Sequence, residues 1–418
     1  MAAICPLTAL HYDLERAGPL HDLIAPPYDV IDPDQREALA ARSPYNAVHV
    51  DLPAGDDPYE NAARTFGRWR DEGAVVLDTT PALWALTQDF TDPDGTRRTR
   101  SGFLCAVRVE PYGAGRIRPH ERTHPGPKED RLHLTRATKA NLSPIFALYD
   151  DPRHAVWSEL ADNTAGPPFA EATSDDGTLN RLWRIDDDES LDVVEATLAG
   201  TELLIADGHH RYETARVYAD EVGGEGPHRW VLMYLVALQD PGLALYPTHR
   251  LARGVDPEAL ADAIRRDFDI EEIDRAELVP DAPAPDGRIR IGYMDSHFKR
   301  AFRLTLKDPA IADRALPDKP EPYRRLDTAV VEALLLKGAM GMSDDDIAHL
   351  SGLGYARDFD EAVALIDDAT YDVGFFMGPV PVEQVQAVAA AGENMPPKST
   401  FFAPKVPTGL VFHPLSDR

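Results

Sequence analysis

The sequence has few cysteines, a shortage of basic residues and no long hydrophobic run. Its 418 residues include only two cysteines, Cys5 and Cys105, whose separation favours two reduced thiols over a disulfide. No stretch approaches the roughly 18 apolar residues of a membrane-spanning helix. The first residues also lack the basic and apolar regions of a signal peptide. We therefore expect a cytoplasmic protein without a membrane partner.

Positive charge is scarce, because 43 lysines and arginines stand against 71 aspartates and glutamates, giving a net charge of −28. DNA and anionic lipids both require a positive protein face. We therefore expect no nucleic-acid partner, although a local basic pocket could still bind a phosphate. The alternative explanation of the acidity is a salt-adapted or high-GC source.

The composition is otherwise that of a folded protein, with 43% hydrophobic and 27% charged residues. The length indicates more than one lobe. Strand-like and helical segments alternate, which predicts an α+β fold with a mixed sheet and helices. The predicted strands are 47–52, 83–90, 102–109, 179–185, 203–206, 230–238, 288–293, 301–306 and 372–377, and the predicted helices are 59–72, 211–218, 257–268, 327–337 and 382–391.

The best candidate boundary inside the chain is the proline- and aspartate-rich stretch 279–286, VPDAPAPD. It predicts an N-terminal α/β region over residues 1–278, which contains the most notable motif of the chain. The C-terminal α/β region would then span residues 287–418 and close with the MPPKST segment. The oligomeric state stays open, a homodimer included.

That motif is IADGHHRYETA at residues 205–215. A buried strand ends, Gly208 permits a positive φ, and a helix begins with His209, His210 and Arg211. Free N–H groups at a helix start favour an anion, and an arginine offers two parallel donors to a phosphate. Cations at a helix start disfavour the helix alone, which indicates a bound anion. The alternative is a structural turn with solvated histidines.

A second cluster of charged residues and imidazoles lies at residues 118–131, RPHERTHPGPKEDR. A carboxylate next to an imidazole, with lysine and arginine nearby, could abstract a proton and neutralise a phosphate. The alternative is a solvated, charge-rich loop.

Two further segments could contribute to a site. The rigid stretch 25–30, APPYDV, carries Tyr28 and Asp29, and the stretch 394–410 alternates prolines with lysine, serine and threonine. For the second of these segments, an ordered tail pinned by prolines and aromatics is an equally good interpretation.

Metal ligands are available in His120, His124, His209, His210 and Asp207. The sequence contains no HExxH and no paired CxxC motif, which disfavours zinc. Mg²⁺ fits better, because a carboxylate and the phosphates of a substrate suffice to hold it. Asp207 is the candidate ligand.

Four motifs in this order resemble the bacterial and archaeal DUF1015 family: APPYDV (25–30), PHERT (119–123), ADGHHRYETA (206–215) and MPPKST (395–400). Within the third, Gly208-x-His210-Arg211-x-x-x-Ala215 is similar to the phosphate-binding signature of the ParB/sulfiredoxin superfamily. Sulfiredoxins carry cysteine where this chain has His209, and ParB proteins need a basic DNA-binding domain. The free-serine kinases resemble the chain best.

This resemblance implies that Asp207, His210 and Arg211 contact nucleotide phosphates and Mg²⁺, with Glu121 as the base. The interval between Glu121 and Asp207 is longer than in that enzyme class. Asp207, His210 and Glu121 are thus the predicted catalytic residues. The predicted phosphate- or nucleotide-binding residues are Gly208, His209, Arg211, His120, Thr123, Lys128 and Arg131. Candidates for a substrate or second loop are Tyr28, Asp29, Lys398, Ser399, Thr400 and Lys405.

The predicted function is a phosphotransferase that uses ATP or ADP with Mg²⁺ and phosphorylates a small hydroxylated metabolite, L-serine being the best candidate. One alternative is a nucleotide-binding regulatory protein with little or no turnover. The other is a hydrolase of small phosphoesters.

Overall fold

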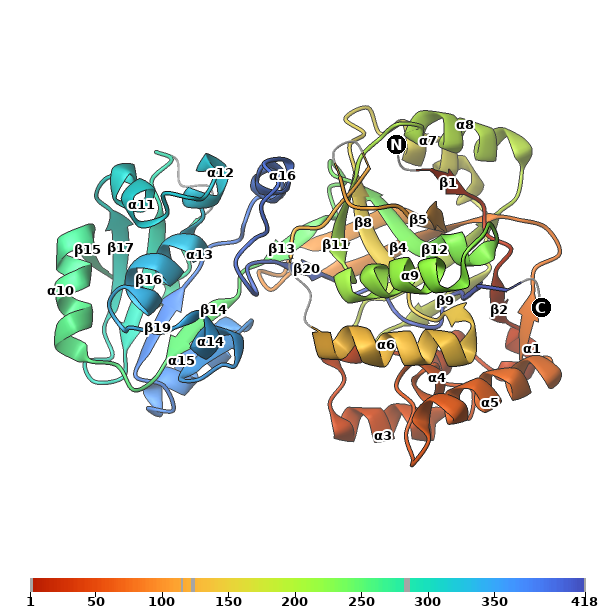
Figure 1. The fold of residues 1–418 in the computed structure, drawn as a ribbon, viewed down its shortest axis with the longest axis horizontal. Helices are drawn as coiled ribbons and strands as arrows, with labels where there is room; N and C mark the ends of the chain where they lie inside the picture. The colour runs from red at the N-terminus through yellow and green to blue at the C-terminus, as the bar shows by residue number, and fades with distance from the viewer. Residues whose placement is uncertain (1–2, 114–115, 122–124, 282–285, 417–418) are drawn as a thin grey trace. The chain divides into compact units, whose positions relative to one another are not determined.

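The computed structural model describes residues 3–113, 116–121, 125–281 and 286–416. The chain divides into two compact units, as Figure 1 shows by colour along the chain. The first unit comprises the residues up to Leu243 together with those from Pro404 onward, and the second comprises Ala244–Ala403. Strands and helices alternate in both units, so the predicted mixed α/β architecture is confirmed.

The first unit is built around a mixed sheet with the strand order β6-β11-β8-β12-β5-β4-β10-β9, and β1 pairs with β5. Its pairs are antiparallel except for β11 with β6 and β12 with β8. The strands are β1 (Ile4–Cys5), β4 (Leu83–Thr91), β5 (Arg97–Arg108), β6 (Ile117–Arg118), β8 (Ile145–Tyr149), β9 (Ala170–Thr173), β10 (Leu179–Ile185), β11 (Leu203–Asp207) and β12 (Trp230–Ala237). Two short pairs lie outside it: β2 (Leu10–Tyr12) with β3 (Val75–Leu77), and β7 (Ala140–Asn141) with β21 (His413–Pro414).

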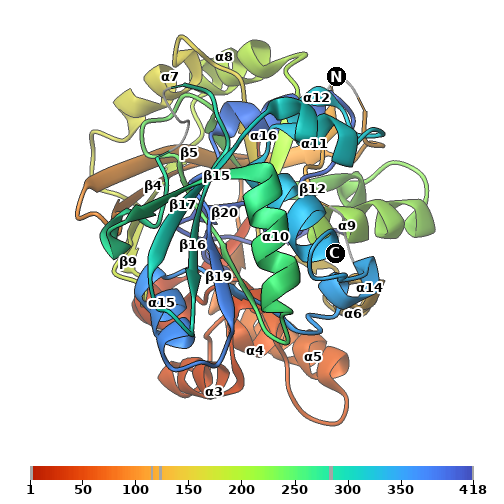
Figure 2. The same cartoon turned by 90° about the vertical axis from the view of Figure 1, so that its left-hand side faces the viewer.

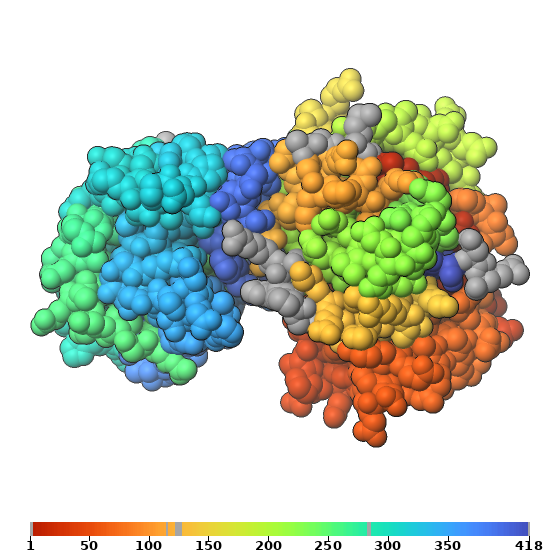
Figure 3. Space-filling view, viewed as in Figure 1, coloured from red at the N-terminus to blue at the C-terminus, as the bar shows by residue number. Residues whose placement is uncertain are grey.

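Helices cover this sheet and extend beyond it in layers. Side chains of α7, α8 and α9 pack with the sheet in one hydrophobic core. Helix α6 lies beside α9 on one side and beside α5 on the other, which is visible in Figures 1 and 3. The helices of this unit are α1 (Leu14–Ala17), α2 (Leu20–Leu23), η1 (Tyr28–Val30), α3 (Pro33–Arg42), α4 (Val48–Asp51), α5 (Pro58–Asp71), α6 (Pro125–Thr138), α7 (Ala155–Asn163), α8 (Asp188–Leu198), α9 (His209–Val222) and η2 (Pro227–Arg229).

The second unit contains an antiparallel sheet with the order β15-β17-β16-β19-β14-β18. Helix α10 packs on one of its faces and α15 on the other (Figure 2). The strands are β13 (Ala244–Tyr246), β14 (His249–Ala252), β15 (Phe268–Ile273), β16 (Arg290–Asp295), β17 (Ala301–Leu306), β18 (Leu353–Ala356), β19 (Val373–Phe376) and β20 (Phe401–Ala403). The helices are α10 (Pro257–Asp267), η3 (Arg275–Glu277), α11 (Pro309–Ala315), α12 (Glu321–Arg324), α13 (Asp327–Val330), the π-helix η4 (Val331–Lys337), α14 (Asp344–Ala348), α15 (Phe359–Asp367) and α16 (Val382–Ala390).

The stretch 279–286, taken from the sequence as a boundary, falls inside the second unit, between β15 and β16. Residues 282–285 lie outside the described residues. Strands β15 and β16 both pair with β17, so the chain stays within one sheet on either side of this stretch. A proline-rich connection between two strands of one sheet can have the same composition as a linker between domains.

The strand predicted over 47–52 is wrong, because these residues form the short helix α4. The Asn46 side chain accepts a hydrogen bond from the Val48 N–H at 2.9 Å, a local contact that favours a turn. Val48, Val50 and Asp51 are all buried, so their alternating polarity does not mark one buried and one exposed face. The other predicted strands and helices occur, with shifted ends. Elements that were not predicted include helices α3, α6, α7, α8 and α15 and strands β8, β14 and β15. Across the described residues, no helix has the length and apolarity needed to cross a membrane.

Candidate functional site

The predicted strand–turn–helix around Gly208 is present. Strand β11 ends at Asp207, with its register shifted by a bulge between Ile205 and Asp207, and α9 begins at His209. Bulges of this kind redirect a side chain at a strand end. Gly208 adopts φ +94° and ψ 29°, and a Cβ there would lie 2.9 Å from Nε of Arg211. Both the left-handed backbone and the close approach of Arg211 therefore require glycine.

The Asp207 carboxylate lies between two cations. Its Oδ1 is 2.7 Å from Nζ of Lys405, and its Oδ2 is 2.7 Å from Nη2 of Arg211. Burial alone would raise the pKa of Asp207, but the charges of Lys405 and Arg211 together lower it well below its ordinary value. Lys405 and Arg211 thus flank the carboxylate just before a helix start, where backbone N–H groups favour an anion.

Arg211 continues into a chain of buried polar groups. Its Nη1 donates to Oγ of Ser143 at 2.9 Å and to the carbonyl oxygen of Pro144. Oγ of Ser143 is 2.9 Å from Oγ1 of Thr408, which donates to Oδ2 of Asp51 at 3.3 Å. Residues from three distant parts of the sequence thus hold the arginine of the turn in place.

Arg131 closes this network from helix α6. Its side chain is buried and donates to the carbonyl oxygen of Asp51 at 2.7 Å and to the carboxylate of Asp130 at 2.8 Å. Its guanidinium carbon lies 4.0 Å from the centre of the Tyr28 ring. Burial raises the pKa of Tyr28 to about 12. Arg131, which the sequence predicts as a phosphate ligand, is therefore already paired with Asp51 and Asp130.

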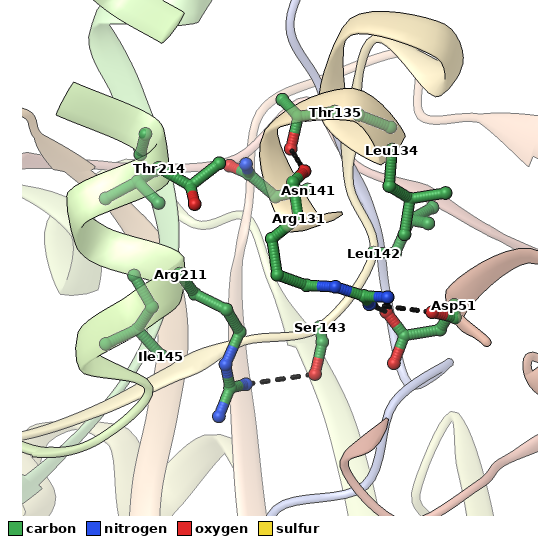
Figure 4. Close-up of a pocket in the computed structure, with 13 residues that line it drawn as sticks. Asp51, Arg131, Leu134, Thr135, Asn141, Leu142, Ser143, Ile145, Arg211 and Thr214 are labelled. Atoms are coloured by element: carbon green, nitrogen blue, oxygen red, sulfur yellow. Dashed lines mark hydrogen bonds and ion pairs between the residues drawn. The ribbon is translucent and has the colours of Figure 1, made fainter. Parts of the chain in front are cut away.

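Arg131 and Arg211 point into one cavity from α6 and α9, with Ser143 between them (Figure 4). The cavity has a volume of about 40 Å³. It offers room for about three water molecules. A nucleotide is too large for it and would have to bind on the solvent side of the Gly208 turn.

Two buried histidines meet beside the turn. Nδ1 of His120 donates to the carbonyl oxygen of Ile205 at 2.6 Å, and the backbone N–H of His120 donates to Nε2 of His209 at 3.2 Å. Their ring centres are 4.7 Å apart at an angle of 78°. Burial lowers the pKa of both imidazoles and so favours their neutral forms. Nε2 of His209 acts as a hydrogen-bond acceptor in this structure.

The remaining candidates of the first unit are placed as follows. Glu121 is half-buried and directly follows His120, whose backbone N–H donates to His209. His210 is partly exposed in the first turn of α9, and Asp29 lies in η1. The carbonyl oxygen of Lys128 accepts a hydrogen bond from the Thr214 hydroxyl at 3.4 Å. Thr123 lies outside the described residues.

The C-terminal candidates divide between the two units. Lys405 belongs to the first unit and contacts Asp207. Lys398, Ser399 and Thr400 belong to the second unit. There the buried Ser399 hydroxyl lies 2.7 Å from the carbonyl oxygen of Pro396.

A metal ion at Asp207 would have to displace a cation. Both carboxylate oxygens of Asp207 already bind Lys405 or Arg211. Within the described ranges, no three histidine, cysteine, aspartate or glutamate side chains gather closely enough to hold a metal. These residues do not fit a bound Mg²⁺ in the present arrangement, and we assign it no step.

Sequence reasoning missed Asp51 and Ser143. Asp51 lies 80 positions from Arg131, and Ser143 lies 68 positions from Arg211. Neither stands in a motif that predicts such a contact. Asp51 is a buried polar side chain at the end of a helix. Its place in the site can be recognised only once its partner, Arg131, is known.

A family model described as "Protein of unknown function (DUF1015)" matches residues 4–329. The chain belongs to the DUF1015 family. The match includes three of the four family motifs, those at 25–30, 119–123 and 206–215, and ends before the fourth. No curated protein matches the chain.

Several solved structures are similar to parts of the chain. A mutant of free serine kinase in complex with ADP is 12% identical, with a TM-score of 0.37 over 69% of this chain and 84% of that one. A conserved hypothetical protein from Pyrococcus furiosus is 16% identical, with a TM-score of 0.34 over 70% and 89%. Truncated SbnI from Staphylococcus aureus is 14% identical, with a TM-score of 0.37 over 75% and 87%.

Proposed function

We propose that the protein is a nucleotide-dependent phosphotransferase, which transfers a phosphoryl group from ATP or ADP to the hydroxyl of a small metabolite. The observation that carries this proposal is the pairing of Asp207 with Lys405 and Arg211 at the N-terminus of α9. Phosphoryl transfer depends mainly on positioning and on neutralising charge. An ordered lysine and an ordered arginine beside a helix start supply both.

In the proposed reaction, the phosphates of the nucleotide lie over the Gly208 turn and contact Arg211 and Lys405. The hydroxyl oxygen of the acceptor attacks the terminal phosphorus, and the bond from phosphorus to the nucleotide oxygen breaks. Glu121 takes the hydroxyl proton, since it follows His120, whose backbone is hydrogen-bonded to His209. The products are the phosphorylated metabolite and ADP or AMP. L-serine, which would give O-phosphoserine, is the first acceptor to test.

The test is to incubate the protein with ATP or ADP, Mg²⁺ and L-serine or other hydroxylated metabolites, and to detect the product by ³¹P NMR. We expect Glu121→Gln to abolish turnover while nucleotide still binds. Lys405→Ala should weaken nucleotide binding by about 10-fold to 100-fold, the value of a charged hydrogen bond. Lys139→Ala, which changes an exposed lysine of the same unit, serves as the control and should alter neither property.

Nucleotide binding without turnover is a second candidate function. Both oxygens of Asp207 already bind cations, which leaves no obvious place for Mg²⁺. A rise in melting temperature with nucleotide, but no product with any acceptor, would favour this function over the phosphotransferase. Release of phosphate from a phosphorylated metabolite without nucleotide would instead identify a phosphoester hydrolase.

A further inference from the structure

A second pocket of the first unit lies along the segment that carries Tyr28. Its volume is about 190 Å³. Six of its lining residues are aliphatic or proline and form the apolar part of the wall. These residues are Ile24, Ala25, Pro26, Val30, Leu39 and Pro407. The rest of the wall is polar or charged and consists of His21, Gln35, Arg42, Thr173, Ser174, Asp175, Asp176 and Lys405.

Lys405 connects this pocket to the Asp207 turn. The lysine lines the pocket, and its Nζ is 2.7 Å from Oδ1 of Asp207. A lysine has a flexible four-carbon stem with the charge at its end. The pocket and the proposed phosphate site are therefore separated by the length of one side chain.

The walls of the pocket are held in place without a ligand. Ala25 and Thr408 exchange backbone hydrogen bonds of 3.1 and 2.8 Å, which fix the segment before Tyr28 against the C-terminal residues. Arg42 donates two hydrogen bonds of 2.8 and 2.9 Å to the carboxylate of Asp175, which join α3 to the turn after β9. Paired donors of this kind fix geometry as well as adding energy. Because such a pocket is already formed, little free energy is needed to order its side chains when a ligand binds.

Size and chemistry favour an aromatic ring as the occupant. The pocket, at about 190 Å³, is smaller than the roughly 300 to 1,000 Å³ of sites that enclose a whole ligand. It therefore suits one part of a larger molecule. A small polar acceptor such as serine would leave the apolar walls uncovered. A flat nucleobase covers such walls and presents polar edges to groups like those of Gln35 and Thr173.

We infer that this pocket holds the base of the nucleotide whose phosphates bind at the Asp207 turn, an inference that rests on the proposed function. The base would lie among Pro26, Leu39 and Pro407, and the phosphates would extend past Lys405 to Arg211. The protein would then bind a nucleoside phosphate more tightly than a chain of phosphates alone.

The test compares the affinities of ATP and inorganic tripolyphosphate by calorimetry. Gln35→Trp fills the pocket from α3, and Thr173→Trp fills it from the strand on the β9 side, so that one variant can replace the other if it fails to fold. Each should lower the affinity for ATP by at least about 10-fold and leave that for tripolyphosphate unchanged. Ala38→Trp, on the exposed face of the same helix as Gln35, is the matched control and should change neither the affinity for ATP nor that for tripolyphosphate.

Three outcomes would overturn the inference. The wild-type protein could bind ATP and tripolyphosphate equally, or a folded Gln35→Trp or Thr173→Trp variant could keep the wild-type affinity for ATP. Either result would remove the base pocket but leave a phosphate site at Asp207. If the wild-type protein bound neither compound, the proposed function itself would fail, and the base pocket with it.

Discussion

At the scale of the single residue, Gly208 makes two contributions that can be separated. Its positive φ costs any other residue about 1 to 2 kcal/mol, and a Cβ would also push against the Arg211 guanidinium. We predict that Gly208→Ala destabilises the protein by about 1 to 2 kcal/mol more than Gly177→Ala, because it disturbs a charged hydrogen bond. Gly177 has a φ of +83° and open space around it, which makes it a matched control. Urea unfolding measures both values, and equal losses would contradict the contact with Arg211.

The Asp207 ion pairs should give stability that depends on pH. A carboxyl whose pKa is lowered by folding stabilises the protein above its unfolded pKa of about 3.9, and this stability is lost as the pH falls toward the folded pKa. Asp207→Asn leaves Lys405 and Arg211 facing each other, so we predict a loss of about 3 kcal/mol at pH 7. The difference from wild type should shrink only below about pH 4.

The control for this prediction is Asp220→Asn in α9, the helix that follows Asp207. Asp220 pairs with Arg229, but its side chain is 82% exposed, and a surface pair contributes little. Its substitution should change the free energy of unfolding by less than about 0.5 kcal/mol. An Asp207→Asn effect that is equal at pH 7 and pH 3 would show that lost packing, not charge, is responsible.

The sequence predicted the turn because its residues are consecutive. A buried strand, a glycine and a helical pattern follow one another from Leu203 to Tyr218, so local rules suffice. The partners of Arg131 and Arg211 were not predictable in this way. Asp51 and Ser143 approach them only through the packing of α4, α6 and α9. The neutrality of His209 also depends on burial that a sequence does not display.

At the scale of the helix or strand, local sequence patterns did not predict the segments whose structure depends on tertiary contacts. The stretch 118–131 contains breakers and charges typical of a loop, yet its second part forms α6. Arg131 on that helix is buried because Asp51 and Asp130 pair with it. Residues 118–131 therefore contribute a buried arginine to the site. A solvated loop would instead leave this arginine exposed.

The C-terminal segment supplies a second element whose role can be tested. Thr408 is fully buried, and its hydroxyl joins Ser143 to Asp51. We predict that Thr408→Val costs about 1 to 3 kcal/mol, because it leaves buried polar groups without a partner. Thr138→Val is the control, since that hydroxyl bonds only to a carbonyl of its own helix at 2.9 Å. Chemical unfolding of both variants checks the prediction, and a neutral Thr408→Val would show that the hydroxyl bonds to Ser143 and Asp51 contribute little stability.

At the scale of the whole molecule, the chain leaves its first unit and later returns to it. Residues from Pro404 onward pack with the first unit, so Lys405 reaches Asp207 across 198 positions of sequence. Composition alone placed a boundary at 279–286, inside the second unit. No local signal marks Leu243 or Pro404 as points of division. They separate two hydrophobic cores, and a core is a property of long-range packing.

The net charge of −28 should make the stability of the whole molecule depend on salt. Like charges spread over a folded surface repel one another, and salt shortens the range of this repulsion to about 10 Å at 0.1 M. We predict that raising NaCl from about 0.02 M to 0.5 M at pH 7.5 stabilises the protein by about 1 kcal/mol. For a chain of this size, that is a rise of roughly 1 °C in melting temperature.

The same salt series near pH 5 is the control for this prediction. The sequence has an isoelectric point of about 4.8, so the net charge there is small and salt has little repulsion to screen. Salt also weakens the surface ion pairs, which opposes the expected rise. A melting temperature that falls with salt at pH 7.5 would show that these pairs outweigh the net repulsion. A rise of equal size at both pH values would instead point to salt acting on apolar burial.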